Sequence, residues 1–447
     1  MQASRFNISI PDVPGPGELL IFNTLSGGLF VLEPEYRQTL EKVSKGEPLD
    51  EEDQSRAAEL ASEGYLAPSA EFEEDKLVHH MLGAEYATPS TLQAKVLTTM
   101  SCNLACKYCF ETHMERAPRM SLDTAHKVCE LIMKRAEDGQ VKVIEIDFYG
   151  GEPLLNQPVI EEVSRTLGEF AKEKGMEYRF TMTTNGTLLT PEVVNKLKPL
   201  GLAGARVTLD GLPQVHDARR PFRKGDGSCF QVIMNNLEQI LDKLPVTLTN
   251  IYSGDDLSNT EALLDYLGEK GLLKKFKAFQ VGPEMGYLDE QGKVCGSAGC
   301  NMDIDTAENF LKGLTMLFER GVKFRGDLLA ASNCSLSTEG GGLLFAPEGD
   351  IFKCPMLMGQ SQYAVGRVDA PDFFPRYYSD INRQKWRECP ERDSCAYLPM
   401  CGTGLGCRLS ALEKKQPLWG DSCTKDFMEA YVPQAMKLEL YFNQGEE

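Results

Sequence analysis

Residues 101–110 read Ser-Cys-Asn-Leu-Ala-Cys-Lys-Tyr-Cys-Phe and place Cys102, Cys106 and Cys109 within eight positions. A short loop can turn three sulfurs toward one point, whereas a helix or a strand would spread them. The spacing therefore predicts a metal centre with three thiolate ligands. Zinc would want a fourth ligand, and the spacing of the nearby His113 matches no common zinc finger. We favour a 4Fe-4S cluster, in which three cysteines leave one iron open to a chelating molecule.

The composition of the whole chain limits the other possibilities. Its 447 residues allow two to four domains, at about 150 residues each. The formal net charge of −19 argues against nucleic acid as a partner. No apolar run of about 18 residues and no signal-peptide pattern is present, so we expect a soluble, cytoplasmic protein without a membrane partner. Reducing compartments do not use cysteines as disulfides, so the fourteen cysteines need another explanation.

The loop with its three cysteines, followed by the aromatic Phe110, resembles the signature of radical S-adenosylmethionine (SAM) enzymes. In that family the open iron binds the amino and carboxylate groups of the cofactor's methionine part. An electron from the cluster then cleaves the sulfonium and releases a 5′-deoxyadenosyl radical, while the protein orients and shields it. The resemblance implies that Tyr108 and Phe110 lie beside the cofactor.

Gly150-Gly151-Glu152-Pro153 follows the predicted strand 143–149. Alone, it is a turn that ends a strand. About forty residues after the cysteines, it resembles the family's motif for the amino group of the cofactor. Glycines allow a ligand to approach the backbone closely, and the Glu152 carboxylate can accept hydrogen bonds from an ammonium group.

Further candidates follow later strands. Thr184 and Asn185 end the predicted strand 178–184, and Asp210 follows the strand 205–209. The resemblance implies that these segments contact the ribose and the carboxylate of SAM, with Arg220 paired to the carboxylate. The alternative for each residue is an ordinary turn or surface position.

Strands and helices alternate through the middle of the chain. Predicted strands at 143–149, 178–184, 205–209, 246–251 and 276–281 are separated or followed by predicted helices at 122–135, 158–174, 191–200, 230–244, 260–270 and 306–320. Counted from Leu92, this gives about six units. Such alternation predicts an α/β fold with a parallel sheet whose ligands bind at the carboxyl ends of the strands. The resemblance implies a partial (β/α)6 radical SAM barrel over residues 90–322.

The later cysteines form a second group. The resemblance here is to the SPASM domain of peptide-modifying radical enzymes, expected over residues 323–447 and carrying two auxiliary 4Fe-4S clusters. It implies one cluster on Cys334, Cys354 and Cys407, and another on Cys389, Cys395, Cys401 and Cys423. Cys295, Cys300 or a substrate thiolate would complete the first set.

The spacing of the middle four cysteines departs from the family pattern, and a zinc ribbon is the structural alternative. Residues 402–406 look superficially like a nucleotide loop, but they follow no strand and lie between two proposed ligands, so we set them aside. Cys129 and Cys229 adjoin apolar residues and are assigned to the core.

The first 75 residues form a different unit. Strands are predicted at 6–10, 19–23 and 28–32 and helices at 34–43 and 51–63, an order similar to small winged-helix modules that bind leader peptides. An exposed strand edge there can recruit a peptide by strand addition; the alternative is a unit that only covers the barrel. Residues 70–76 are charged and are expected to form a linker.

Together these patterns predict a radical SAM maturase with three 4Fe-4S clusters, acting in the cytoplasm of an anaerobe. It would abstract hydrogen from a ribosomally made, cysteine-containing peptide and install a thioether or other cross-link. Its electron donor would be a flavodoxin or a ferredoxin. No general base stands out.

Two alternatives remain. One is a formylglycine-forming, anaerobic sulfatase-maturating type of enzyme, although Pro355 stands where such enzymes have an acid after the cysteine aligned with Cys354. The other is a metal-bearing scaffold that binds peptides without catalysis. Iron content together with cofactor cleavage separates the enzymes from the scaffold.

Overall fold

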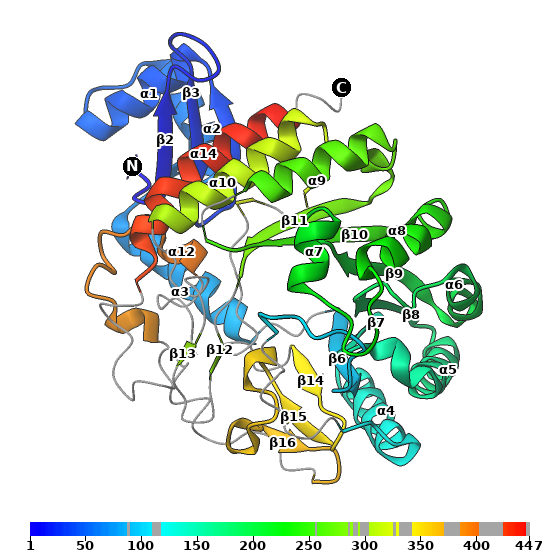
Figure 1. The fold of residues 1–447 in the computed structure, drawn as a ribbon. Coiled ribbons are helices and arrows are strands. Elements are labelled where there is room, and N and C mark those ends of the chain that lie inside the picture. Colours follow the sequence, from blue (N-terminus) through cyan, green and yellow to red (C-terminus); the bar gives the residue numbers. More distant parts are fainter. Residues whose placement is uncertain are drawn as a thin grey trace.

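The computed structural model (Figure 1) describes residues 1–86, 90–109, 118–254, 257–284, 287–288, 294–295, 304–324, 328–329, 342–370, 385–401 and 423–443. Several residues singled out above lie outside these ranges, namely Phe110, His113, Cys300, Cys334, Cys407 and the stretch 402–406. Cys295 ends the short strand β13, Val294–Cys295, which pairs with β12, Tyr287–Leu288.

Six parallel strands form the centre of the molecule and neighbour one another in chain order. They are β6 Thr91–Thr99, β7 Val143–Gly150, β8 Glu177–Thr184, β9 Leu202–Thr208, β10 Val246–Tyr252 and β11 Ala278–Pro283. Because parallel neighbours need a crossover connection, each strand is followed by at least one helix. The predicted α/β architecture with a mostly parallel sheet is confirmed.

The helices after these strands cover one face of the sheet (Figure 1). They are α4 Leu122–Asp138, α5 Gln157–Lys174, α6 Pro191–Leu197, α7 Pro213–Arg219, α8 Cys229–Ile240, α9 Ser258–Glu269 and α10 Ile304–Glu319. Fully buried side chains such as Phe148, Phe180 and Ile132 pack in the core between sheet and helices. Polar side chains alternate with them along the strands, so the opposite face of the sheet is polar.

The predicted elements of this region are all present, with shifts at their ends. The largest is at the end of α8, which stops at Ile240 and not at 244, and β9 begins at Leu202 and not at 205. Gly201 ends the preceding turn with φ of 104°, a conformation that favours glycine, and the chain enters the strand at once. Cys129 and Cys229 are buried, as expected for core residues.

The C-terminal segment continues the central sheet. Strand β14, Leu343–Phe345, runs parallel to β6, and β15, Asp350–Phe352, and β16, Gly366–Arg367, follow antiparallel. Helix α14, Lys425–Asn443, packs beside α10 (Figure 1), with Phe310 against Tyr431. A short helix, α12, spans Leu398–Cys401. The sheet therefore crosses the predicted boundary at residue 322, and that boundary stays a prediction.

The N-terminal segment has its own antiparallel sheet, ordered β2 Asn7–Pro11, β3 Leu19–Asn23 and β4 Leu29–Leu32. Helices α1, Pro34–Lys45, and α2, Glu51–Ser62, share a small core with it, and β1, Gln2–Ala3, pairs with β5, Leu66–Ala67. The other side of β3 packs, through Leu20 and Phe22, into the cluster that holds α14. The predicted strands and helices of this segment are present.

The expectation of a linker at residues 70–76 is wrong, because they begin helix α3, Ala70–Tyr86. The charges there are not merely solvated: Glu73 is buried and both Glu73 and Glu74 lie within ion-pair distance of Arg5. One turn later Leu77 and Met81 are fully buried against Trp386. No helix of the described residues is long and apolar enough to cross a membrane.

Candidate active site

A cavity of about 340 Å³ opens at the carboxyl ends of the parallel strands, and we call it the thiol cavity. Nine of the predicted site residues line it: Cys102, Cys106, Tyr108, Cys109, Gly150, Gly151, Thr184, Asn185 and Arg220. They come from the loop after β6, the end of β7, the end of β8 and the segment after α7. Residues spread over more than one hundred positions of sequence are thus brought to one place.

The cysteine loop, residues 101–109, is bound by the segment 219–223. The amide of Ala105 donates to the Pro221 carbonyl at 2.8 Å, and that of Lys107 donates to the Arg219 carbonyl at 2.9 Å. In return the Arg223 amide donates to the Asn103 carbonyl at 2.8 Å. The Arg223 Nε also donates to the Cys102 carbonyl at 3.2 Å. These bonds tie the cysteine loop to the segment 219–223 through three backbone amides and one arginine side chain.

The end of β8 supports the same loop from another side. The Asn185 Nδ2 donates to Asn103 Oδ1 at 2.8 Å and lies 3.7 Å from the Cys102 sulfur. The Asn103 Nδ2 donates to Thr187 Oγ1 at 2.8 Å. Burial raises the pKa of the Cys102 thiol to about 11. That thiol is therefore protonated in the metal-free chain, and metal binding has to displace its proton.

The two glycines are required by the protein's own backbone. Both line the cavity, but a Cβ on Gly150 would overlap the Thr99 carbonyl oxygen, and a Cβ on Gly151 would overlap those of Met100 and Ser101. Gly150 also has φ of 125°. The close approach is therefore between β7 and the chain that leaves β6, and it brings the glycine backbone to the cavity wall.

Glu152 lies beneath this turn and is not among the residues that line the cavity. Its fully buried carboxylate accepts hydrogen bonds from the amides of Leu154, at 3.1 Å, and Asn185, at 2.8 Å, and from Thr184 Oγ1, at 2.8 and 3.0 Å. Burial raises its pKa, against the effect of these donors. The carboxylate ties the turn after β7 to the end of β8, and the predicted contact with an ammonium group stays a prediction.

Tyr108, Asp210 and Arg220 form a hydrogen-bonded chain. The Tyr108 hydroxyl donates to Asp210 Oδ2 at 2.6 Å and accepts from Arg220 Nη1 at 2.9 Å. The Asp210 side chain is buried behind the tyrosine and also accepts from Arg219 Nε at 3.3 Å. Arg220 is 8% exposed, and its Nε is buried without a hydrogen-bond partner in the described chain. Arg220 is thus positioned to receive an anion, whereas Asp210 positions Tyr108 and Arg219.

Some residues of the site were not predicted. Asn103, Arg206 and Arg223 carry no motif, and their roles depend on contacts across the fold. A signal for Arg206 did exist, because polar residues alternate with buried ones along β8 and β9. In a buried parallel sheet such alternation indicates that one face borders a polar cavity.

Four cysteines of the C-terminal group, Cys389, Cys395, Cys401 and Cys423, lie near enough to affect one another's pKa. Burial raises the pKa of the Cys389 thiol, and the charges of Cys423 and Cys401 add to the effect. Burial likewise raises the pKa of Cys395 to about 11, with contributions from Cys389 and Cys401. These are the four residues predicted to share one cluster. Cys354 follows β15 and packs against the main core, and the segment directly after it contacts β12, the partner strand of the one that ends at Cys295.

His216 adds a dependence of stability on pH. Its side chain is fully buried, its Nδ1 accepts from the Asp210 amide at 3.1 Å, and burial and the charge of Arg220 lower its pKa to about 4. The unfolded chain takes up a proton near pH 6.5 and the folded chain does not, so stability falls as pH decreases from about 6.5 to 4. By pH 5.5 the loss is about 1 kcal/mol.

We expect His216→Asn, which keeps an acceptor for that amide, to remove this part of the pH dependence. Urea unfolding at pH 7.5 and pH 5.5 measures it. Equal loss of stability by the wild type and the variant on acidification would contradict the burial argument.

Comparisons with known proteins agree with this site. Residues 96–267 match the family model of the Radical SAM superfamily. Mycofactocin maturase MftC of Mycolicibacterium smegmatis is 25% identical over 329 residues, which cover 71% of this chain and 77% of that protein. The structure of native anSMEcpe with bound AdoMet and Kp18Cys peptide superposes with a TM-score of 0.59 at 18% identity, covering 79% of this chain and 99% of that one.

Streptococcus suis SuiB bound to the precursor peptide SuiA superposes with a TM-score of 0.52 at 15% identity, covering 95% of this chain and 99% of that one. At these identities the structural likeness establishes the fold. The match of residues 96–267 to the Radical SAM superfamily, together with relatives that are named maturases, indicates that the chain is an enzyme. The alternative of a non-catalytic scaffold is therefore dropped.

Proposed function

We propose that this enzyme is a peptide maturase that removes hydrogen from a ribosomally made, cysteine-containing peptide and installs a thioether or other cross-link. The observation that carries the proposal is the convergence of three cysteines and Arg220 on one cavity at the carboxyl ends of the strands. The similarity to MftC, and the fold shared with two proteins whose structures contain a peptide, support a peptide substrate. We infer that the six strand and helix units form the partial barrel of the superfamily.

The residues of the thiol cavity fit a 4Fe-4S cluster with SAM. Cys102, Cys106 and Cys109 would hold the cluster, and the unpartnered Arg220 Nε offers a donor to the carboxylate of SAM. When bound and reduced, this pair supplies the 5′-deoxyadenosyl radical. The chain itself fixes the loop through the segment 219–223 and fixes the glycine turn through Glu152. An external donor, a flavodoxin or a ferredoxin, would deliver the electron.

The product tests the function. Forming a C–S bond from a C–H and an S–H removes two hydrogen atoms: one leaves as a hydrogen atom on 5′-deoxyadenosine, the other as a proton and an electron. We expect a short cysteine-containing peptide encoded beside the gene to lose two hydrogens and one alkylatable thiol when incubated anaerobically with enzyme, SAM and dithionite. Mass spectrometry measures both. An unchanged peptide, with SAM cleaved, would contradict the proposal.

The mass of the product also distinguishes a cross-linked peptide from one that contains formylglycine. Oxidation of a cysteine to formylglycine replaces sulfur by oxygen, whereas a thioether keeps the sulfur. Pro355 follows Cys354 and offers no acid that could act as a base. The likeness to anSMEcpe concerns the fold, so the absence of this acid favours the cross-linking reaction.

The electron released during cross-linking needs an acceptor near the substrate. We infer that Cys389, Cys395, Cys401 and Cys423 hold one auxiliary 4Fe-4S cluster, supported by their mutual effects on pKa. Cys354, together with Cys334 and Cys407 from outside the described residues, is proposed for the other. Cys295 or Cys300 remains a candidate to complete that set.

Cys395→Ala separates this electron path from radical generation. We expect the variant to lose peptide modification, by about 100-fold or more, while retaining some SAM cleavage uncoupled from the peptide. Chromatography of 5′-deoxyadenosine and mass spectrometry of the peptide measure the two activities, with Cys129→Ala, a buried core thiol, as the control. Full peptide modification by Cys395→Ala would contradict an essential auxiliary cluster.

We propose that residues 1–75 form a winged-helix-like unit that recruits the peptide. Its strand β4 lies at the edge of the sheet β2-β3-β4 and exposes Phe30, 47% accessible. An edge strand offers unpaired backbone groups to an extended peptide. The fold shared with SuiB, whose structure contains the precursor peptide SuiA, supports this role.

A further inference from the structure

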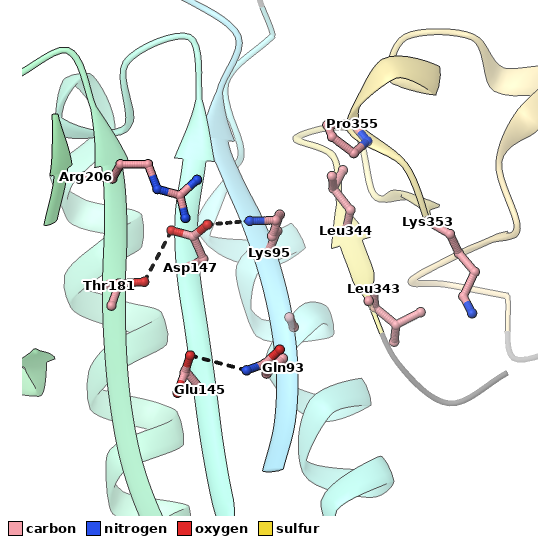
Figure 2. Close-up of a pocket in the computed structure, with 12 residues that line it drawn as sticks. Gln93, Lys95, Glu145, Asp147, Thr181, Arg206, Leu343, Leu344, Lys353 and Pro355 are labelled. Carbon is pink, nitrogen blue, oxygen red and sulfur yellow. Dashed lines mark hydrogen bonds and ion pairs between the residues drawn. The ribbon is translucent and has the colours of Figure 1, made fainter. Parts of the chain in front are cut away.

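A second cavity, of about 270 Å³, lies on the polar face of the sheet, and we call it the sheet cavity. Its walls come from β6, β7, β8, β9 and β14, and from the segment that carries Cys354, through Lys353 and Pro355. Figure 2 shows these side chains, with Arg206 on the strand side and Pro355 across from it. Arg206 also lines the thiol cavity, so it stands where the two spaces meet.

The two carboxylates of the sheet cavity are already paired with cations. Asp147 Oδ2 lies 2.5 Å from Lys95 Nζ, and Glu145 Oε2 lies 2.6 Å from Arg179 Nη2. Figure 2 shows Asp147 joined by dashed lines to Lys95 and to Thr181, and not to Arg206. Lys353, the remaining cation of the wall, has a partner as well.

Arg206 is different, because its guanidinium has no hydrogen bond or ion pair with any residue that the structure describes. The thiol cavity does not supply one either, since none of its lining residues is an aspartate or a glutamate. Its other two arginines are engaged: Arg220 with Tyr108, and Arg223 with the Cys102 carbonyl. A half-buried cation without an anion marks a place where a ligand can supply the charge.

We propose that Arg206 binds a carboxylate of the substrate. The proposal rests on the peptide substrate of the proposed function, since a carboxylate is the anion that an unmodified peptide carries, on Asp, on Glu or at its C-terminus. A guanidinium matches a carboxylate through two parallel hydrogen bonds and so fixes its orientation. Anchored at Arg206, the peptide extends toward the cysteines of the thiol cavity on one side and toward Lys353 and Pro355 on the other.

Arginine-selective labelling tests the site without turnover. The protein with its reconstituted iron, without SAM and with SAM, is treated with phenylglyoxal, and labelling of Arg206 is measured by peptide mass spectrometry. Arg165, 50% exposed on α5, is the internal reference. The probes are N-acetylglutamate α-methylamide, with a side-chain carboxylate, N-acetylglycylglycine, with a terminal one, and N-acetylglutamine methylamide, with none.

We expect at least one carboxylate probe to slow labelling of Arg206, and not of Arg165, about tenfold more than the amide probe does, as a charge-assisted hydrogen bond predicts. The probe that protects Arg206 shows whether the site recognises a side-chain carboxylate or a C-terminal one. Saturation-transfer NMR should show binding of that probe to the wild type and to Arg165→Gln, weaker binding to Arg206→Lys, and none to Arg206→Gln.

Three results would overturn the assignment: equal protection by the amide probe, protection by SAM alone, which would make the bound carboxylate the cofactor's, or probe binding to Arg206→Gln. A different result is expected if Arg206 binds a carboxylate but the proposed peptide substrate is wrong. In that case the carboxylate probes still protect Arg206, but no peptide is modified.

Discussion

Replacing Cys106 with alanine is expected to abolish formation of 5′-deoxyadenosine. Cys106 is one of three thiols on the thiol cavity, and a cluster that loses one of its three protein ligands is not retained. Anaerobic reconstitution followed by iron analysis and chromatography of the cleavage product measures the effect. With three clusters in the wild type, the iron content should fall from about twelve to about eight atoms per chain.

Cys129→Ala is the matched control, because it also removes one thiol, but one that lies on the buried face of α4 in the core. It should keep both the iron and the cleavage activity. Normal SAM cleavage by Cys106→Ala would refute the assignment of the cysteine loop.

The second large effect is expected from Gly150→Ala. The new Cβ would overlap the Thr99 carbonyl oxygen, which belongs to backbone and cannot rotate away, at a residue whose φ of 125° already disfavours a side chain. Strain and overpacking together should lower the free energy of unfolding by about 4 kcal/mol. Because the glycine backbone forms the cavity wall, SAM binding measured by equilibrium dialysis should be lost as well.

Gly175→Ala is the control that separates the effect of the overlap with Thr99 from the effect of a positive φ. Gly175 ends α5 with φ of 70°, and a Cβ there would meet nothing within 4 Å. We expect a loss of about 1 kcal/mol and unchanged SAM binding. If the two variants lost similar stability in urea unfolding, the overlap with Thr99 would not be the cause.

The α/β fold with a mostly parallel central sheet could be predicted from the sequence because its signals are local. Apolar periodicity and turn residues mark each strand and helix between β6 and α10, and alternation alone implies a parallel sheet with its ligands at one edge. The family resemblance, and not the periodicity, selected Cys102, Gly150, Asn185 and Arg220 as candidates, and the structure places all four on one cavity.

Other features depend on partners distant in sequence and were missed or misjudged. The charged start of α3 looked like a linker, since nothing nearby shows that Arg5 and Trp386 cover it. The donors to Glu152 come from Thr184 and Asn185 at the end of β8, which no local pattern indicates, and its predicted contact with the cofactor stays a prediction. The role proposed for Arg206 could be inferred only from the structure, in which the neighbouring carboxylates of Asp147 and Glu145 are paired with other cations.

The bonds between the cysteine loop and the segment 219–223 bear on how the enzyme withstands damage. Small zinc domains unfold when their metal is removed, because the metal supplies their folding energy. Here the loop takes its shape from backbone hydrogen bonds at Ala105, Lys107 and Arg223. We therefore expect that, if oxygen destroys the proposed cluster, the folded chain survives and iron can be loaded again.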